Sequence, residues 1–410
     1  MSEQNAPRKV AIVGANLAGA RAAEALRNLG YSGSLCLIGE EELRPYERPP
    51  LSKTALEDDS AVPQWVHAES FYRDNNIDLI TGRAVTSMKV LAPRRFQLSL
   101  SDGTQQEADV VLLTTGGSPR RLSSDKDGIV HYIRQWEDAA RLRPQLLEGR
   151  RVLVIGSGFI GAEVAATALG RGCQVSVIEA EPLLFPSIPS RIVANAMSEL
   201  FSERGATLVV GRSVVGISAE AGGAVALLDD GSAIHADIIV AGIGIEPRVE
   251  LARMVDAEVA RGVLVGGDFQ TTVAGLYAAG DVCTIAGKDG DGVHVEHWKA
   301  AQEQGVCAAH AILGKDIPPL SAAWCWSDQL GQRIEVAGTP RSTDQQVVRE
   351  GADGELCVFH LRDGRLAGVV SLNSARTMRG AMKLLEKRAK PDVGQLADQG
   401  IPINRVACEE

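Results

Sequence analysis

The sequence feature that most constrains this 410-residue chain is a pattern of apolar stretches and glycines that occurs twice. In residues 9–40 an apolar stretch leads into the turn Gly14-Ala-Asn-Leu-Ala-Gly19, followed by an alanine-rich stretch and a second apolar stretch that ends in an acid. Residues 151–179 repeat this order around the turn Gly156-Ser-Gly-Phe-Ile-Gly161. Each copy predicts strand, glycine turn, helix and strand, which form the βαβ unit of Rossmann-type dinucleotide-binding domains.

The spacing of the glycines has a physical reason in such a unit. The first makes a tight turn, the second lets backbone N–H groups approach a pyrophosphate, and the third lets helix and strand pack closely. The phosphates then bind at the positive end of the helix. Glu40 and Glu179, which end the two copies, are expected to accept hydrogen bonds from ribose hydroxyls and to repel a 2′-phosphate. Since no arginine closely follows Glu179, the second unit is predicted to bind NADH rather than NADPH.

The first copy departs from the pattern because Asn16 stands where the middle glycine is expected. Asparagine is the residue other than glycine that best tolerates a positive φ, so the turn is expected to survive. Two readings of the side chain remain open at this point: it could crowd the pyrophosphate or donate a hydrogen bond to it.

Composition and charge exclude several other classes of protein. The chain is 45% apolar, which is too much for a disordered protein, and its net charge of −10 argues against nucleic acid as the main partner. The longest apolar run, at residues 238–245, is far shorter than a membrane span of roughly 18 residues. The polar residues 1–9 do not resemble a signal peptide, so we expect a cytoplasmic location and no membrane partner.

Cysteine and histidine spacing predicts neither a metal site nor a thiol redox centre. The seven cysteines are scattered without a C-x-x-C pair, and we expect them to be buried as small apolar residues. His294 and His297 flank Glu296, but in an extended segment they would face opposite sides, and no further ligands are near in sequence. We therefore predict no metal.

A third motif is Thr271-Thr-Val-Ala-Gly-Leu-Tyr-Ala-Ala-Gly280-Asp281. With it, the chain resembles the FAD-dependent pyridine nucleotide-disulfide oxidoreductases of glutathione-reductase-like fold. The resemblance implies that FAD binds the first βαβ unit and NADH the second, with Asp281 on the ribityl chain of FAD. Thr114-Thr-Gly116-Gly and Gly242-Ile-Gly244 resemble the crossovers between the two domains. The expected fold class is α/β, with two Rossmann-like domains and a small C-terminal α+β domain.

The segment Arg44-Pro-Tyr-Glu-Arg48-Pro-Pro-Leu-Ser-Lys53 narrows the resemblance to the ferredoxin reductases that serve bacterial oxygenases, of the putidaredoxin reductase and biphenyl dioxygenase reductase type. Disulfide reductases of this fold carry redox cysteines in this region, and here there is none. Trp324-Cys-Trp326-Ser-Asp-Gln329 resembles the start of the C-terminal domain of these reductases. The likeness runs from residue 10 to about residue 396, and Asn16 and Arg248 are its clearest departures.

The resemblance and the glycine turns together assign candidate site residues. For FAD they are Gly14, Asn16, Ala18, Gly19, Glu40, Arg48, Pro49, Lys53, Val85, Thr115, Gly116, Arg134, Gly280, Asp281 and Trp298. For NADH they are Gly156, Gly158, Phe159, Ile160, Gly161, Glu179 and Gly244. The resemblance places Lys53 beside the flavin ring and pairs it with Glu163, and these two are the predicted catalytic residues. The lysine would stabilise a negatively charged reduced flavin.

The implied activity is transfer of a hydride from NADH to FAD and of single electrons to a two-iron ferredoxin, which in turn supplies a monooxygenase or a ring-hydroxylating dioxygenase. Because such ferredoxins are usually acidic, a basic patch is needed on this acidic chain. A helix over residues 374–390 would place basic residues on one face, opposite an apolar face of Met378, Met382, Leu385 and Ala389. The predicted docking residues are Arg376, Arg379, Lys383, Lys387 and Trp326, with Lys390 on the same helical face. A solvated helix face without a partner is the alternative.

Three domains are expected along the chain: an FAD domain over residues 1–115 and 246–320, an NAD domain over residues 116–245, and a C-terminal domain over residues 321–410. Residues 214–236 are predicted to form a hairpin, and the Asp363-Gly364 turn is predicted to join two strands of the last domain. Two other functions stay open: a soluble NADH oxidase, and a binding protein whose assembly NADH switches. The sequence leaves the oligomeric state undetermined.

Overall fold

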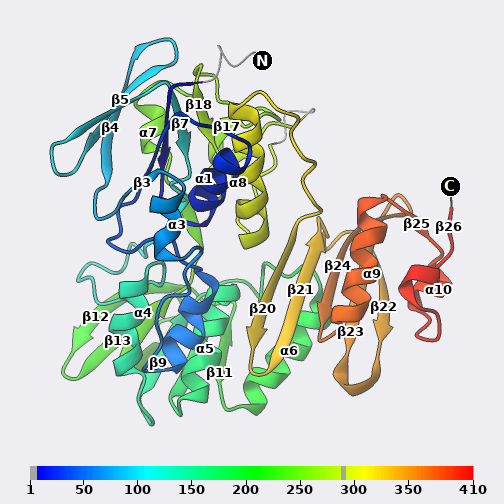
Figure 1. The fold of residues 1–410 in the computed structure, drawn as a ribbon. Coiled ribbons are helices and arrows are strands. Elements are labelled where there is room, and N and C mark those ends of the chain that lie inside the picture. The colour runs from blue at the N-terminus through cyan, green and yellow to red at the C-terminus, as the bar shows by residue number, and fades with distance from the viewer. Residues whose placement is uncertain (1–6, 288–291, 410) are drawn as a thin grey trace. The chain divides into compact units, whose positions relative to one another are not determined.

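The computed structural model describes residues 7–287 and 292–409 (Figure 1). The first six residues of the polar N-terminal segment lie outside this range. The chain forms two compact units. The first contains Met1–Glu47, Pro63–Ser118 and Ile245–Ser321, and the second contains Arg48–Val62, Pro119–Gly244 and Ala322–Glu410. These cuts differ from the three predicted domains, whose bounds stay a prediction.

The first unit is built on a five-stranded parallel sheet in the order β18-β7-β1-β2-β3. Its strands are β1 (Lys9–Val13), β2 (Ser34–Ile38), β3 (Ile77–Ile80), β4 (Val85–Ala92), β5 (Arg95–Leu100), β6 (Gln105–Ala108), β7 (Val110–Leu113), β16 (Ile245–Pro247), β17 (Val263–Val265), β18 (Leu276–Ala278) and β19 (Cys283–Ile285), and β8 (Gly117–Pro119) begins in it. Its helices are α1 (Leu17–Asn28), α3 (Glu69–Asp74), α7 (Glu250–Arg253) and α8 (Trp298–Ile312).

Small residues let the helices of this unit approach one another closely. Helix α1 carries alanines on its buried side and packs against α8. A side chain at Gly305 of α8 would put its Cβ 2.4 Å from the carbonyl oxygen of Ala18, so only glycine fits there. Strands β1 and β7 are buried along nearly their whole length, as expected for a parallel sheet whose two faces are both covered. The predicted strand–turn–helix–strand order of the first copy is confirmed.

The second unit contains a four-stranded parallel sheet in the order β11-β10-β9-β15 and a five-stranded antiparallel sheet in the order β20-β21-β24-β23-β22. Its strands are β9 (Arg151–Ile155), β10 (Gln174–Glu179), β11 (Thr207–Val210), β12 (Val214–Glu220), β13 (Gly223–Leu228), β14 (Ala233–Ala236), β15 (Ile238–Ala241), β20 (Trp324–Gln329), β21 (Gln332–Gly338), β22 (Gln345–Glu350), β23 (Leu356–Arg362), β24 (Arg365–Leu372), β25 (Lys390–Pro391) and β26 (Cys408–Glu409). Its helices are η2 (Pro49–Ser52), α2 (Thr54–Glu57), α4 (Trp136–Leu142), η3 (Arg143–Gln145), α5 (Phe159–Gly170), α6 (Arg191–Glu203), η4 (Ala352–Gly354), α9 (Ala375–Glu386), α10 (Val393–Ala397) and η5 (Ile403–Arg405).

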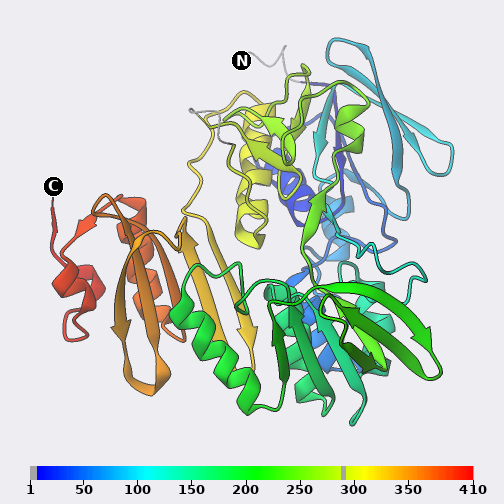
Figure 2. The same cartoon turned by 180° about the vertical axis from the view of Figure 1, so that it is seen from behind.

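The second copy of the repeat forms the centre of the parallel sheet, as predicted. The expected hairpin at residues 214–236 is confirmed as the antiparallel strands β12, β13 and β14. In the C-terminal sheet, Asp363 and Gly364 turn with φ of 53° and 73° between β23 and β24, the left-handed backbone that a two-residue hairpin turn requires. Helix α9 covers one face of this sheet (Figure 1), and α6 lies beside β11, as the view from behind shows (Figure 2).

Residues Arg48–Val62 belong to the second unit, although they follow β2 of the first unit in sequence. Proline at the start of η2 fixes a short 3-10 turn, after which α2 makes a single helical turn. These two elements pack against α4 and α5. The predicted catalytic lysine is therefore carried by the same unit as the second glycine turn.

Candidate functional site

The first glycine turn has the backbone that close packing around a nucleotide site needs. Gly14 has a φ of +119°, and a Cβ there would lie 2.2 Å from the carbonyl oxygen of Thr114. A Cβ at Gly19 would lie 2.2 Å from the carbonyl oxygen of Gly14. Helix α1 begins at Leu17, within this turn, so the N–H of Ala18 in its first turn has no partner within the helix and is available to a phosphate.

Asn16 does not need the positive φ that its place in the turn suggested. Its φ is −127° and its ψ −168°, so the residue is extended and acts as the N-cap of α1. Its Oδ1 accepts from the N–H of Gly19 at 3.4 Å, and its Nδ2 donates to the carbonyl oxygen of Thr114 at 2.5 Å. The argument from positive φ was wrong. Both ends of the amide are used within the protein, which leaves phosphate contacts to backbone N–H groups.

The second glycine turn is open where a pyrophosphate would approach. Gly156 has a φ of +91°, and a Cβ at Gly161 would lie 2.1 Å from the Gly156 carbonyl oxygen, so packing requires both glycines. A Cβ at Gly158 would meet only the Gly242 carbonyl oxygen, at 3.8 Å. Protein packing alone therefore does not require glycine at this position. A dinucleotide lying against the backbone does, and the turn fits one.

Glu179 has a second task besides the predicted contact with ribose. Its side chain is buried, and one carboxylate oxygen accepts from the N–H and the hydroxyl of Ser157 at 2.8 and 2.7 Å. The other oxygen accepts from the N–H of Glu181 at 3.0 Å. The acid thus holds the glycine turn against the end of β10. Phe159 and Ile160 form the first turn of α5 beside it, and Ile160 is 39% exposed.

Glu40 in the first unit is half-exposed and forms an ion pair with Arg248. The backbone of Arg248 is also fixed: its N–H donates to the Gly116 carbonyl and its carbonyl accepts from the Thr115 hydroxyl, both at 2.9 Å. The departure at Arg248 therefore supplies a cation to the predicted ribose-binding acid. Sequence reasoning missed this pair, because the two residues are 208 positions apart.

The Gly280-Asp281 motif lies against the start of α1. A Cβ at Gly280 would come 3.1 Å from the Cβ of Ala18, and the N–H of Gly280 donates to the buried side chain of Gln304 at 2.8 Å. Gln304 carries no motif, so the sequence did not reveal it. In the same unit, Val85 begins β4, and the indole N–H of Trp298 donates to the carboxylate of Glu47.

In the second unit Lys53 meets a buried carboxylate. Its Nζ lies 3.0 Å from Oε1 of Glu163, as the resemblance implied, and 3.7 Å from Oδ2 of Asp328. Glu163 is 5% exposed and also accepts from the hydroxyls of Ser52 and Ser327, each at 2.5 Å. Burial raises the pKa of Glu163, while Lys53 and the two hydroxyls act in the opposite direction. The catalytic roles of the pair stay a prediction.

The side chains of strand β20 point alternately to two faces of its sheet, and each face carries a different set of residues. Ser327 points to α5 and Glu163, and its hydroxyl also accepts from the side-chain amide of Gln329 at 2.8 Å. On the other face, Trp324 and Trp326 stack with ring centres 5.0 Å apart. Lys53 Nζ lies 6.0 Å from the centre of the Trp326 ring. The alternation along Trp-Cys-Trp-Ser-Asp-Gln is the sequence signal that could have separated these two sets of residues.

The other predicted FAD and NADH residues of the second unit either shape the backbone or form hydrogen bonds with it. The guanidinium of Arg48 donates to the carbonyl of Arg134, which joins two predicted FAD residues to each other. Pro49 begins η2. Gly244 has a φ of +93°, and its carbonyl accepts from the N–H of Arg120 at 2.9 Å.

The predicted docking helix is shorter than expected. Helix α9 ends at Glu386, Arg388 has a φ of 48°, and Lys390 lies in β25. The prediction that Lys390 shares the helical face was therefore wrong. Four bases, Arg376, Arg379, Lys383 and Lys387, are exposed, whereas Met378, Leu385 and Ala389 are buried and Met382 is half-buried.

The remaining titratable residues of interest have partners within the protein. His294 bonds the Cys283 carbonyl at 2.8 Å and Glu296 at 2.9 Å. Within residues 7–287 and 292–409 no group of three or more His, Cys, Asp or Glu side chains could hold a metal ion.

All seven cysteines are free thiols, and burial raises the pKa of Cys283 and Cys325 to about 12. None of the helices in the described ranges combines the length and the apolar character that crossing a bilayer requires.

Comparison with known proteins covers nearly the whole chain. The model of the pyridine nucleotide-disulphide oxidoreductase family matches residues 8–305, and the reductase C-terminal model matches residues 324–407. The ferredoxin–NAD(+) reductase component of the anthranilate 1,2-dioxygenase system of Burkholderia cepacia is 36% identical over 96% of this chain and 97% of its own. Terpredoxin reductase of a Pseudomonas species is 32% identical over 96% of each chain.

Solved structures agree with the sequence comparison. The reductase in the covalent putidaredoxin reductase–putidaredoxin complex superimposes with a TM-score of 0.91 at 30% identity, covering 98% of each chain. A ferredoxin reductase of Rhodopseudomonas palustris gives the same TM-score and identity over 97% of this chain and 99% of that chain. The predicted fold class is confirmed. The chain is therefore a member of the pyridine nucleotide-disulphide oxidoreductase family with a reductase C-terminal domain.

Proposed function

We propose that this protein is an FAD-dependent NADH:ferredoxin reductase, which passes electrons from NADH to an iron–sulfur ferredoxin that serves an oxygenase. The observation that carries this proposal is the Lys53 segment. Where disulfide reductases of this fold have redox cysteines, the chain has Ser52 and Lys53 held against a buried glutamate. With no thiol there, the chain offers no disulfide to receive electrons from FAD, so the acceptor would be external to the chain. The relatives named as ferredoxin reductase components support that acceptor.

FAD is assigned to the first unit. The tight turn at Gly14 and Gly19, the N–H groups at the start of α1, and Asp281 beside that helix offer a pyrophosphate and a polyol chain suitable partners. The exposed carboxylate of Glu40 is the hydrogen-bond acceptor for the adenosine ribose. When bound, FAD supplies the conversion between hydride transfer and single-electron transfer. The protein binds it, orients it and limits access to it.

NADH is assigned to the second unit. The open backbone at Gly158 and the first turn of α5 receive the pyrophosphate. The negative charge of Glu179, at the end of β10, disfavours a 2′-phosphate and so selects NADH over NADPH.

Lys53 and Glu163 carry the electrostatic part of the mechanism. An ammonium group placed where negative charge develops lowers the energy of the reduced state, and it is most effective when its position is fixed in advance. Glu163, buried and held by two serine hydroxyls, fixes Lys53 at 3.0 Å. Asp328 offers the ammonium group a second carboxylate at 3.7 Å.

The ferredoxin is proposed to bind the face of the C-terminal sheet that α9 partly covers. Trp326 pairs in register with Glu335 on β21, and Trp324 pairs with Ala337, a core residue under α9. The tryptophan pair and the helix therefore lie on the same face of the sheet. The exposed bases of α9 give this face the positive charge that attracts an acidic partner. A solvated helix face without a partner is the alternative.

One experiment separates this function from its rivals. The purified flavoprotein is mixed with NADH in a stopped-flow instrument under anaerobic conditions, and a two-iron ferredoxin or oxygen is then added. Fast reduction by NADH followed by fast ferredoxin reduction supports the proposal. Fast reoxidation by oxygen with slow ferredoxin reduction supports an NADH oxidase. Reduction that changes the assembly state without turnover supports an NADH-switched binding protein.

The cytoplasm is the proposed location. All seven cysteines are free, and several are buried in the core. Free thiols persist in reducing compartments, where NADH is also available.

A further inference from the structure

The segment that carries Lys53 is held along one side of helix α5. Three residues on successive turns of that helix contact the segment, which consists of residues 52–59 and is here termed the lysine segment. Glu163 accepts from the Ser52 hydroxyl and pairs with Lys53. Four residues later, the buried hydroxyl of Thr167 donates to the Ser52 carbonyl at 3.0 Å. Arg171 follows after another four residues, at the end of the helix.

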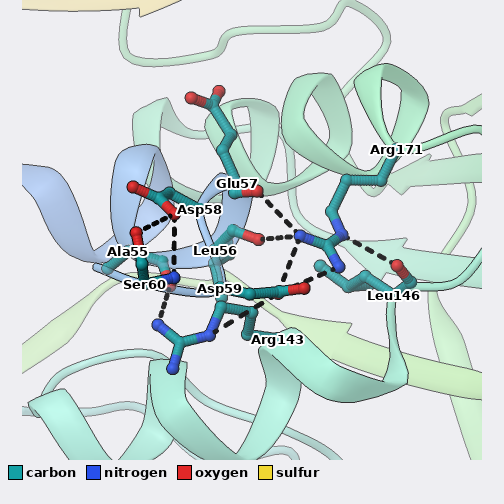
Figure 3. A network of polar contacts seen from close by, with 9 residues as sticks. All are labelled: Ala55, Leu56, Glu57, Asp58, Asp59, Ser60, Arg143, Leu146 and Arg171. Carbon is teal, nitrogen blue, oxygen red and sulfur yellow. Dashed lines mark hydrogen bonds and ion pairs between the residues drawn. The ribbon is translucent and has the colours of Figure 1, made fainter.

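Of these three residues of α5 and its end, Arg171 forms the most hydrogen bonds (Figure 3). Its guanidinium donates to the carbonyls of Leu56 and Glu57 at 3.0 and 2.8 Å, and to the carbonyl of Leu146 at 2.8 Å. Leu56 and Glu57 form the end of α2, whose last carbonyls have no partner within a helix of a single turn. The arginine therefore completes the hydrogen bonding of this short helix and ties it to α5.

A second arginine strengthens the same attachment. Arg143 donates to the carbonyl of Ala55 at 3.1 Å, and its Nε lies 3.9 Å from Asp59 (Figure 3). Asp59 is 78% exposed, so its pairs with the two arginines are screened by solvent and contribute little. The hydrogen bonds to the backbone carbonyls contribute more to the attachment than these ion pairs do. The Arg171 side chain is only 18% exposed, and a backbone carbonyl, unlike the exposed Asp59 side chain, has a fixed position.

The opposite end of α5 bears the glycine turn assigned to NADH. We propose that Thr167 and Arg171 are positioning residues, which fasten the lysine segment to the nicotinamide-binding helix and so fix Lys53 relative to the glycine turn. This inference rests on the proposed function for the role of Lys53, but the attachment itself does not. Through this attachment, the position of Lys53 depends on the position of α5.

The attachment is tested first without reference to activity, by hydrogen–deuterium exchange of the backbone N–H groups of residues 53–58. Three of these groups, those of Leu56, Glu57 and Asp58, donate the hydrogen bonds that close the single turn of α2. In Arg171→Met their exchange should rise by about tenfold, since hydrogen bonds from a charged donor are lost. The control is Arg212→Met, which removes an exposed ion pair with Asp230 and should leave this exchange unchanged. Unchanged exchange in Arg171→Met would overturn the proposal.

The second test measures the limiting rate of flavin reduction by NADH. Arg171→Met should lower it by about 10-fold to 100-fold, the scale expected for a displacement of about 1 Å at the reacting groups, while the NADH concentration at half-maximal rate stays within about twofold. Arg171→Lys should restore only part of the rate, because one ammonium cannot span the carbonyls of Leu146 and Leu56. Thr167→Val, a change of similar shape, should also lower the rate, and Thr167→Ser should restore it.

A double-mutant cycle distinguishes positioning from general damage. If Arg171 acts through Lys53, then Arg171→Met should have no further effect in a Lys53→Met background. Multiplicative effects of the two changes would overturn the positioning role. If Lys53→Met alone leaves flavin reduction unchanged, the proposed role of the lysine fails, and the exchange experiment still decides whether Arg171 holds the segment.

Discussion

Replacement of Glu163 by glutamine would measure how strongly one buried carboxylate organises the second unit. The carboxylate accepts hydrogen bonds from the Ser52 and Ser327 hydroxyls at 2.5 Å and lies 3.0 Å from Lys53 Nζ. Glutamine has almost the same shape and keeps one acceptor oxygen. Its NH₂ group cannot accept from a hydroxyl, and its neutral side chain offers no charge to the lysine. At least one hydroxyl therefore loses its acceptor, and the ammonium group loses its nearest negative charge.

The size of the loss follows from these contacts. A hydrogen bond to a charged group contributes about 1.5–3 kcal/mol, and removal of one partner from a buried ion pair costs about 3–5 kcal/mol. The lysine side chain is 18% exposed and keeps Asp328 at 3.7 Å, so the loss falls towards the lower part of this range. We expect E163Q to lower the free energy of unfolding by about 2–4 kcal/mol.

The assay is urea-induced unfolding followed by tryptophan fluorescence, since Trp324 and Trp326 stack beside the cluster. Glu199→Gln is the matched control: Glu199 is exposed on α6, and its replacement should change the free energy by no more than about 0.5 kcal/mol. A loss of less than about 1 kcal/mol in E163Q, with an unchanged dependence on urea, would refute the reasoning, because breaking this buried pair should cost more.

Four further outcomes are expected. Gly158→Ala should raise the KM for NADH severalfold with little change in thermal stability, since the nearest atom to the added Cβ is 3.8 Å away; coenzyme titration and a melting curve measure both. Asn16→Ala should lower the free energy of unfolding by about 1 kcal/mol through loss of the helix cap, as unfolding curves would show. Because burial raises the pKa of Glu163 in the folded protein, the folded state holds this proton more tightly than the unfolded chain; the free energy of unfolding of the wild-type protein should therefore fall as the pH rises from the ordinary value of 4.5 through the raised value, and E163Q should lack this fall in an unfolding series. Charge reversal at Arg379 and Lys383 should raise the ferredoxin concentration needed for half-maximal turnover and weaken its salt dependence, while reduction of a small artificial acceptor stays unchanged.

Matched variants and contrary outcomes decide these cases. Gly170→Ala adds a methyl group to open space at the last residue of α5, the helix whose N-cap is Gly158, so equal effects on the KM in both variants would argue against pyrophosphate binding at Gly158. Asn16→Ser keeps the cap and should be milder than Asn16→Ala. A deficit of E163Q that grows with rising pH would contradict the raised pKa. Lys89→Glu reverses an exposed charge on β4, and an effect as large as that at α9 would point to net charge rather than to a docking face.

The repeated nucleotide-binding pattern was predictable because it is local. Strand, glycine turn and helix follow one another within about 30 residues, and each needs only its own sequence to be recognised. The Asp363-Gly364 turn was predictable for the same reason. The conformation of Asn16 was not, because the carbonyl of Thr114 that holds its side chain lies 98 residues away in sequence.

The surroundings of Glu163 show the limit of such prediction more clearly. Family resemblance paired the glutamate with Lys53, but the serines that hold it come from positions 111 and 164 residues away. Both serines stand in segments that the family resemblance quoted, but nothing in either segment shows that Ser52 and Ser327 share one carboxylate. The end of α9 was misplaced by a smaller effect: a continued helical period includes Lys390, but the left-handed backbone at Arg388 ends the helix and starts a strand.

The difference in solvent exposure among the seven thiols has a practical consequence. All seven cysteines lie in the described part of the chain, and Cys408 near the C-terminus is the exposed one. Burial raises the pKa of Cys36 and Cys325 to about 12, so these thiols stay protonated and unreactive at neutral pH. A maleimide dye should therefore attach selectively at Cys408, which makes the native sequence suitable for fluorescence measurement of partner binding without removal of any cysteine.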